Sequence, residues 1–356
     1  MVSILDANKG LILYCSVPST SRVFDPGVTL WIIGGRAITN QEDIEAPTIF
    51  STSVVIVNFN AGDFLAAAVE SALAQEDVVE VLVVDNHSTD ESVVQLQELV
   101  SMQSVEIIRL ESNLGFAHAC NVGAERAIGE TLLFLNPDCR MKPGALTQMR
   151  EALFKQTGAG MVGPLLVNPD GSEQRGCRRD IPTPWQIFCV ALMFHKFMPD
   201  HPRFRNFNHT ARPLPGENSI VQAISGACMM VTRGAMDKVG ALDRKFFLHF
   251  EDLDWCQRFA AAGFKIVFAP HAVVEHTRGV CSRQRPIRVE YHKHKSLITF
   301  LRKHFTAYYP SSFMAAVYFV VAMRFFAVVL TKIFGLRKGR PAAWERLMTE
   351  STGSEP

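Results

Sequence analysis

The sequence predicts an α/β fold in which a doubly wound, mostly parallel β-sheet is flanked by helices. Four short runs of apolar and β-branched residues, typical of buried parallel strands, follow one another from residue 53 onwards. Between them lie segments whose small and apolar residues recur at helical spacing. The 356 residues are 48% hydrophobic, which is enough for a full core and excludes a disordered chain.

Strands and helices are expected to alternate strictly in the first half of the chain and less regularly afterwards. The four predicted strands of the first half cover residues 53–59, 78–84, 105–110 and 131–135. The predicted helices between them cover residues 63–73, a segment capped by Asp90 that runs to about residue 100, and residues 115–128. Later elements are expected to be strands at 219–232 and 264–268, and helices from about 233, over 251–262 and over 288–305.

Composition divides the chain into three regions. Residues 1–50 lack a convincing period and are expected to be an extension with one short strand at 29–33. Residues 51–305 carry the regular pattern and form the main domain, in which residues 51–140 differ in character from residues 141–305. Residues 306–356 are predicted to form an apolar and basic C-terminal helix with a tail.

Charge and cysteine usage exclude several classes of function. The formal net charge is only +1, whereas a dedicated nucleic-acid binder usually carries a basic excess, so no nucleic-acid partner is expected. None of the eight cysteines has C-x-x-C spacing, which favours buried, reduced cysteines of a cytosolic protein. Residues 158–163 match G-x-G-x-x-G, but a predicted helix precedes them and an apolar run follows. A nicotinamide dehydrogenase is therefore disfavoured.

The most apolar segment covers residues 313–335 and contains a single central charge, Arg324. A membrane-spanning helix needs about 20 apolar residues, and a central arginine is costly there. A helix lying in the membrane interface, with its basic residues towards anionic head groups, is the favoured interpretation. A single span and a helix docked on the core are the alternatives.

Polar residues follow each predicted strand of the first half, and ligands of such sheets bind beyond the carboxyl ends of the strands. These residues are Asn58, Asn60, Asp85, Asn86, Asn113, Asn136 and Asp138. Asp138 offers an oxygen ligand for Mg²⁺ or Mn²⁺, unless residues 136–138 merely form a turn. Asp85 is ambiguous in the same way, because it can bind a base or ribose or cap a turn.

Three acids, Glu251, Asp252 and Asp254, crowd the start of a predicted helix. They can interact favourably with the helix dipole, or one of them can act as a general base. The preceding aromatic residues could desolvate them, and Trp255 is a candidate stacking surface for a sugar. His276 is either structural or a ligand that joins carboxylates on Mn²⁺.

Taken in order, these motifs resemble those of inverting family 2 glycosyltransferases of the GT-A fold. The resemblance covers residues 50–305, and the subgroup is similar to bacterial rhamnosyltransferases of surface polysaccharide or lipid-linked glycan synthesis. It is carried by residues 54–60, 83–90, 113–123, 134–138, 225–227 and 247–254 and by His276.

The resemblance implies a role for each matched position. Asp252 would be the catalytic base, with Glu251 as its rival. Asp138 would be the last acid of the D-x-D element, whose first acid is replaced by Asn136, and His276 would complete the metal shell. The residues that would contact the donor are Asn58, Asn60, Asp85, Asn113, Gly115, Asn121, Asn136, Ser225 and Gly226.

The resemblance also implies the partners. The donor would be a nucleotide sugar, with dTDP-rhamnose favoured, and Mn²⁺ or Mg²⁺ would stabilise the departing diphosphate. The acceptor would be a glycan or a polyprenyl-diphosphate sugar, for which Trp255, Arg283 and Arg285 are candidate contacts. Residues 51–140 would bind the nucleotide and residues 141–305 the acceptor, at the cytoplasmic membrane face. A non-catalytic nucleotide-sugar sensor or assembly partner is the alternative.

Overall fold

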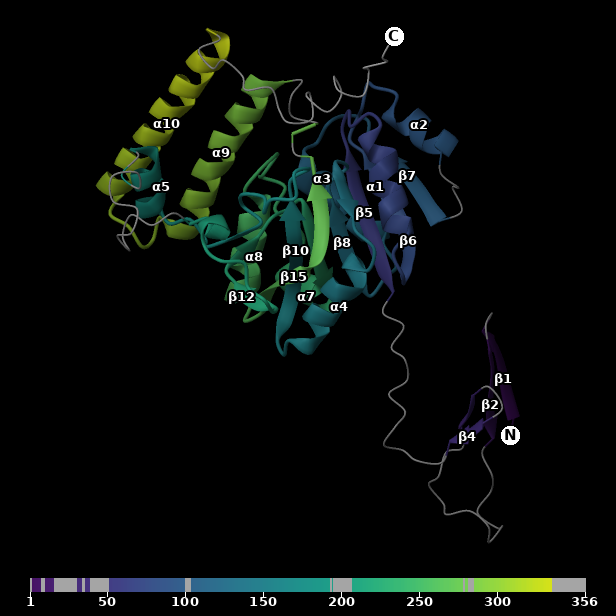
Figure 1. Ribbon diagram of the computed structural model, residues 1–356. Coiled ribbons are helices and arrows are strands. Elements are labelled where there is room, and N and C mark those ends of the chain that lie inside the picture. Colours follow the sequence, from purple (N-terminus) through teal and green to yellow (C-terminus); the bar gives the residue numbers. More distant parts are fainter. Residues whose placement is uncertain are drawn as a thin grey trace, which may run out of the picture. The chain divides into compact units, whose positions relative to one another are not determined.

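The computed structural model describes residues 2–7, 10–15, 31–33, 36–38, 51–99, 104–192, 194, 207–277, 279–280 and 285–334 (Figure 1). Its contacts divide the chain into two units, Met1–Ile49 and Phe50–Pro356. In the first unit, β1 (Val2–Ala7) pairs with β2 (Gly10–Cys15) and β3 (Trp31–Ile33) pairs with β4 (Arg36–Ile38), both antiparallel. The strand expected at 29–33 is present as β3, and the other three strands were not predicted.

The second unit is built on a nine-stranded sheet within the described residues. Along it the strands follow the order β12-β15-β10-β14-β8-β5-β6-β7, and β9 pairs with β15. The strands are β5 (Thr52–Asn58), β6 (Val78–Asp85), β7 (Val105–Arg109), β8 (Thr131–Leu135), β9 (Cys139–Met141), β10 (Ala159–Val167), β12 (Ser219–Val221), β14 (Cys228–Thr232) and β15 (Lys265–His276).

The sheet is mostly parallel, as predicted. Strands β5, β6, β7, β8, β10 and β15 run in one direction, because β14 lies antiparallel to both β8 and β10 and so preserves their common direction. Strands β9, β12 and β14 run the other way. The four strands predicted for the first half are present as β5 to β8, within two residues of their expected ends.

Helices cover both faces of the sheet (Figure 1). Side chains of β5 alternate between the two faces: Val54 and Ile56 belong to one core and Val55 and Val57 to the other. Helices α1 (Phe64–Leu73), α2 (Ser92–Leu99) and α4 (Ala145–Lys155) contribute to the first core. The second core is built with α3 (Phe116–Arg126), α5 (Pro184–Ala191), α7 (Arg233–Val239), α8 (Glu251–Ala261), α9 (Pro286–Phe305) and α10 (Ser311–Ile333).

Two strand predictions for the second half need correction. Residues 219–232 do not form one strand: they form β12, β13 (Ala223–Ile224) and β14, and β13 pairs with the two-residue β11 (Arg178–Arg179). Between β13 and β14 the chain belongs to no strand, and there Ser225 and Gly226 line a cavity. Strand β15 extends to His276, because its pairing with β10 resumes after a register shift next to Pro164.

The glycines at 158–163 do not form a phosphate loop, as expected. Most of this segment belongs to β10, inside the sheet. A Cβ on Gly163 would lie 2.8 Å from side-chain atoms of Ile224, and a Cβ on Gly160 would lie equally close to the ring of Phe264. These two glycines are therefore explained by close packing.

Helix α10 packs on one side against α9 and α5, burying Met314, Val317 and Val321 (Figure 1). Its other side exposes apolar residues, including Phe319 and Phe326 with 66% and 59% of their surface accessible. With a mean hydropathy of 2.3, α10 is the one helix in the described part of the chain that could cross a membrane by length and composition.

Candidate active site

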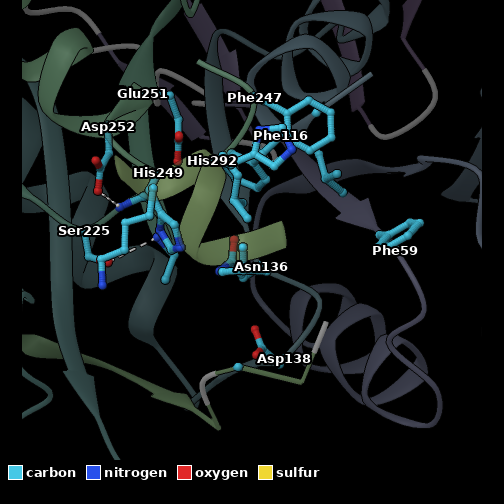
Figure 2. A pocket seen from close by; sticks show the side chains of 18 of the residues that line it. Phe59, Phe116, Asn136, Asp138, Ser225, Phe247, His249, Glu251, Asp252 and His292 are labelled. Atoms are coloured by element: carbon cyan, nitrogen blue, oxygen red, sulfur yellow. Dashed lines mark hydrogen bonds between the residues drawn. The ribbon is translucent and has the colours of Figure 1, made fainter. Parts of the chain in front are cut away.

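A cavity of about 420 Å³ opens beyond the carboxyl ends of β5 and β8 (Figure 2). The first half of the domain contributes polar residues that follow its strands, and the second half contributes carboxylates, a histidine and a basic wall from α9. Among the predicted site residues, those that line it are Asn113, Gly115, Asn136, Asp138, Ser225, Gly226, Glu251, Asp252, His276 and Arg285.

The remaining predicted residues do not line this cavity. Asn58 is fully buried and donates through Nδ2 to Asp85 Oδ1 at 2.9 Å, which supports the loop after β6. Asn60 accepts the Thr89 N–H at 2.7 Å in the same region. Asn121 holds the backbone of Leu242 with two hydrogen bonds of 2.8 and 3.0 Å. Four predicted donor contacts therefore have side chains that position loops next to the cavity: Asn58, Asn60, Asp85 and Asn121.

One predicted acceptor contact, Trp255, also has a different place. Trp255 is fully buried, donates to the carbonyl of Gly240 at 2.9 Å and packs edge-on against Phe134. Its indole could stack on a sugar only if the core opened. Arg283 lies outside the described residues. Instead of Asp85, its neighbour Asn86 lines the cavity, and it binds the Leu114 N–H at 2.9 Å.

Asp138 and His276, 138 residues apart in sequence, are brought together by the pairing of β9 with β15. Cys139 lies opposite His276 in this antiparallel ladder, so Asp138 lies next to the imidazole. The distance from Asp138 Oδ1 to His276 Nε2 is 3.1 Å, and both residues are buried. Together with Cys139 they form a group of potential metal ligands whose atoms lie within 4.8 Å of one another.

The surroundings of this group fit a hard divalent cation held by oxygen and nitrogen. Gln174 donates through Nε2 to the carbonyl of His276 at 3.0 Å, so its Oε1 faces the ring and accepts from Nδ1 at 2.6 Å. That hydrogen bond leaves Nε2 as the ligand atom, in the arrangement usual for metal-binding histidines. Burial raises the pKa of the Cys139 thiol well above its usual range, and the thiol donates to the Ala227 carbonyl. Of the three residues, Asp138 and His276 are therefore the chemically suitable ligands for such a cation.

The two carboxylates at the start of α8 both face the cavity (Figure 2) but have different partners. Asp252 forms an ion pair with Arg179 and accepts the Gly226 N–H at 3.0 Å. Glu251 is buried, and its Oε2 has no hydrogen-bond partner among the described residues. Desolvation, reinforced by the charge of Asp252, raises the pKa of Glu251 to about 8. Near neutral pH Glu251 is therefore mainly protonated.

The backbone before α8 is strained. His249 and Phe250 have φ angles of 65° and 70°, a left-handed conformation that is uncommon outside glycine and asparagine. Strain of this kind persists where the surrounding structure enforces it, often at functional sites. Here the two consecutive residues turn the chain so that Glu251 and Asp252 enter the cavity from the first turn of α8.

Sequence reasoning missed Arg179 and Gln174, because nothing in their local pattern distinguishes them from other polar residues of the irregular middle section. It also missed Phe247, whose carbonyl accepts the Phe116 N–H at 2.8 Å. Glycine is required at position 115, where the backbone passes close to that of Phe247. The φ angle of Gly115 is 91°, and a Cβ there would lie 2.6 Å from the Phe247 oxygen. The ring of Phe247 stacks on His292 of α9 at 4.1 Å between centroids.

The raised pKa of Glu251 predicts that the stability of the folded protein depends on pH. The folded protein keeps a proton that the unfolded chain loses above its usual pKa of 4.5. This contribution to stability is fully present below about pH 4.5 and is lost as the pH rises through about 8. The glutamine of Glu251→Gln stays neutral at every pH. Between about pH 4.5 and 8, the free energy of unfolding of this variant should therefore rise relative to that of the wild type by up to about 1.4 kcal/mol per pH unit. Urea denaturation at pH 5 and 7.5 measures the difference; an equal difference at both pH values would contradict the assignment.

Comparison with known proteins assigns this chain to a protein family. The family model described as "Glycosyl transferase family 2" matches residues 53–240, which is more than half of the chain. This chain belongs to glycosyl transferase family 2. The predicted family is confirmed, and the protein is a glycosyltransferase.

This chain is similar to two curated proteins in sequence and to one solved structure in fold. An N-acetylglucosaminyl-diphospho-decaprenol L-rhamnosyltransferase of Mycobacterium tuberculosis is 30% identical over 263 residues, covering 70% of this chain and 83% of the relative. The low-salt glycan biosynthesis hexosyltransferase Agl10 of Haloferax volcanii is 22% identical, over 62% of this chain and 64% of the relative. The Pyrobaculum calidifontis mannosyltransferase solved with GDP-Man and Mn²⁺ has a TM-score of 0.49 at 14% identity, covering 84% and 79% of the two chains.

Proposed function

We propose that this glycosyltransferase moves rhamnose from dTDP-rhamnose, with inversion, to a polyprenyl-diphosphate-linked sugar in cell-surface polysaccharide synthesis. One observation carries the proposal: a single cavity brings the buried pair of Asp138 and His276 together with the carboxylate of Asp252. The identity of the donor and the acceptor is supported by the mycobacterial relative, which is a rhamnosyltransferase acting on a lipid-linked N-acetylglucosamine.

The polar wall of the cavity, which the first half of the domain contributes, suits the nucleotide. Asn86 and Asn113 are hydrogen-bonded to each other at 3.2 Å and line the same wall, close to the backbone of Gly115. Amide groups held in this way offer both donors and acceptors to a base or ribose. Asp138 and His276 would hold a divalent cation, with Mn²⁺ suited by the mixed oxygen and nitrogen ligands. When bound, the cation supplies Lewis-acid stabilisation of the leaving diphosphate.

Asp252 is the proposed base. It takes the proton of the acceptor hydroxyl while the hydroxyl oxygen bonds to the anomeric carbon, and the bond from that carbon to the diphosphate oxygen breaks on the opposite face. A base must be ionised before the reaction, and the raised pKa of Glu251 disfavours that neighbour for the role. Arg179 and the Gly226 N–H hold the carboxylate of Asp252 in place. Glu251, protonated, is left as a hydrogen-bond donor in the same cavity.

The apolar side of α10 supports a location on the membrane. Its exposed residues recur at helical spacing and form the apolar stripe, which consists of Phe319, Met323, Phe326, Leu330 and Ile333. A stripe of this kind suits a helix lying in the interface at the cytoplasmic face, where the nucleotide sugar is available. The buried side of the same helix remains packed on α9 and α5.

A donor-binding panel tests the proposal. Purified full-length protein is titrated with dTDP-rhamnose, UDP-sugars and GDP-sugars, each with Mn²⁺, Mg²⁺ or a chelator. We expect dTDP-rhamnose to bind tightest, and chelation to weaken its binding. Equal or absent binding of all donors would contradict the proposed donor and would favour a non-catalytic relative.

A further inference from the structure

A second cavity of about 370 Å³ adjoins the first. Six residues line both, and Asp252 is one of them, so the proposed base lies at the junction of the two spaces. The outer wall of the second cavity comes from α5, α9 and α10. A group entering from that side would approach Asp252 from outside the donor cavity.

Cationic side chains dominate the polar lining of this second cavity. Arg175, Arg179, Lys293 and Arg324 line it, whereas Asp252 is its single acidic residue among those described. Arg175 and Arg324 have no carboxylate partner within salt-bridge distance in the described part of the chain. Unpaired arginines around one space are suited to an anion such as a diphosphate.

The position of Arg324 explains the charge in the middle of the apolar helix. Val317, Val321 and Arg324 follow one another at spacings of four and three residues, so Arg324 shares the protein-facing side of α10 with two buried residues. The apolar stripe lies on the opposite side of the same helix. The arginine therefore faces the second cavity rather than the surface that suits lipid.

The end of the second cavity next to α5 is apolar. Ile187 and Val190 of α5 and Val321 of α10 line it. Close by, the rings of Trp185 and Phe188 pack against Phe313 at 6.1 and 5.7 Å between centroids. A hydrocarbon chain leaving the cavity here would meet further apolar surface on α5 and α10.

We propose that the second cavity is the acceptor site, with the diphosphate between Arg175, Lys293 and Arg324, the acceptor sugar at Asp252 and the polyprenyl chain along the α5–α10 wall. This inference rests on the proposed function and adds to it the site of the lipid-linked acceptor. It also separates two roles within α10: Arg324 binds the acceptor, and the apolar stripe binds the membrane.

Equilibrium binding tests the site without requiring turnover. The probes are farnesyl-diphospho-N-acetylglucosamine and farnesyl N-acetylglucosaminide, which lacks the diphosphate. Arg324→Gln should weaken binding of the diphosphate probe about tenfold, equivalent to about 1.4 kcal/mol, and leave the uncharged probe unchanged. Val190→Phe, which fills the apolar end, should weaken both probes. Arg126→Gln is the matched control, because Arg126 is an exposed arginine paired with Glu106 that lines neither cavity.

Several outcomes would overturn the inference. They are no binding of the diphosphate probe to wild type, unchanged affinity in Arg324→Gln, or equal losses for both probes in that variant. Loss of binding to anionic vesicles in Arg324→Gln without a change in probe affinity would assign the arginine to lipid head groups instead. Binding of dTDP-rhamnose, measured on the same samples, reports separately on the proposed function.

Discussion

Replacing Asp252 with Asn is expected to reduce glycosyl transfer by about 10²–10⁴-fold while donor binding survives. Asparagine keeps the size of the side chain and an oxygen that can accept the Gly226 N–H, but it cannot take up a proton. The loss should therefore appear in kcat and not in donor affinity. Initial rates of transfer and donor titrations on the same preparation measure the two quantities.

Two variants make the Asp252 result specific. Glu251→Gln tests the neighbouring carboxylate and should lower the rate much less, because the Glu251 that it replaces is already mainly protonated near neutral pH. Asp237→Asn removes an exposed carboxylate on α7 and should leave the rate unchanged. Full activity of Asp252→Asn, or a greater loss in Glu251→Gln, would exclude Asp252 as the base and favour its neighbour.

Replacing Asp138 with Ala is expected to abolish the metal-dependent part of donor binding. The variant with Mn²⁺ should bind dTDP-rhamnose no better than wild type with a chelator, since only one ligand, His276, would remain. Gln174→Ala should weaken the metal effect by about 10–100-fold, because Gln174 orients the imidazole without binding the ion.

Isothermal titration in the presence and absence of Mn²⁺ measures the Asp138 effect. Asp63→Ala is the control, because this exposed aspartate at the start of α1 makes no side-chain capping bond. Unchanged donor affinity in Asp138→Ala, both with metal and with chelator, would remove Asp138 from the metal site.

The strands of residues 51–140 could be predicted because each is a continuous apolar run ended by polar residues. The second half was harder to predict, since its strands are interrupted where the chain builds the cavity. Residues 225–227 belong to no strand and separate β13 from β14, and a pattern of apolar residues on both sides concealed that break. Strand β9 is only three residues long, too short for a periodic signal.

The site could be predicted where a residue type and its position at a strand end or helix start agree, as they do for Asp138 and Asp252. The direction in which each side chain points could not be predicted. Asn58 and Asp85 also follow strands, but their side chains bond to each other beneath the loop and do not line the cavity. Arg179 reaches Asp252 across 73 residues through the short pairing of β11 with β13, which leaves no trace in the local sequence.

The proposed rhamnosyl transfer with inversion can be read directly from the structure of the product. The full-length protein is incubated with dTDP-rhamnose, Mn²⁺ and farnesyl-diphospho-N-acetylglucosamine, and the anomeric configuration of the new linkage is determined by NMR. We predict a rhamnosylated product whose anomeric configuration is opposite to that of the donor. A product that retains the donor configuration, or none containing rhamnose, would contradict the account.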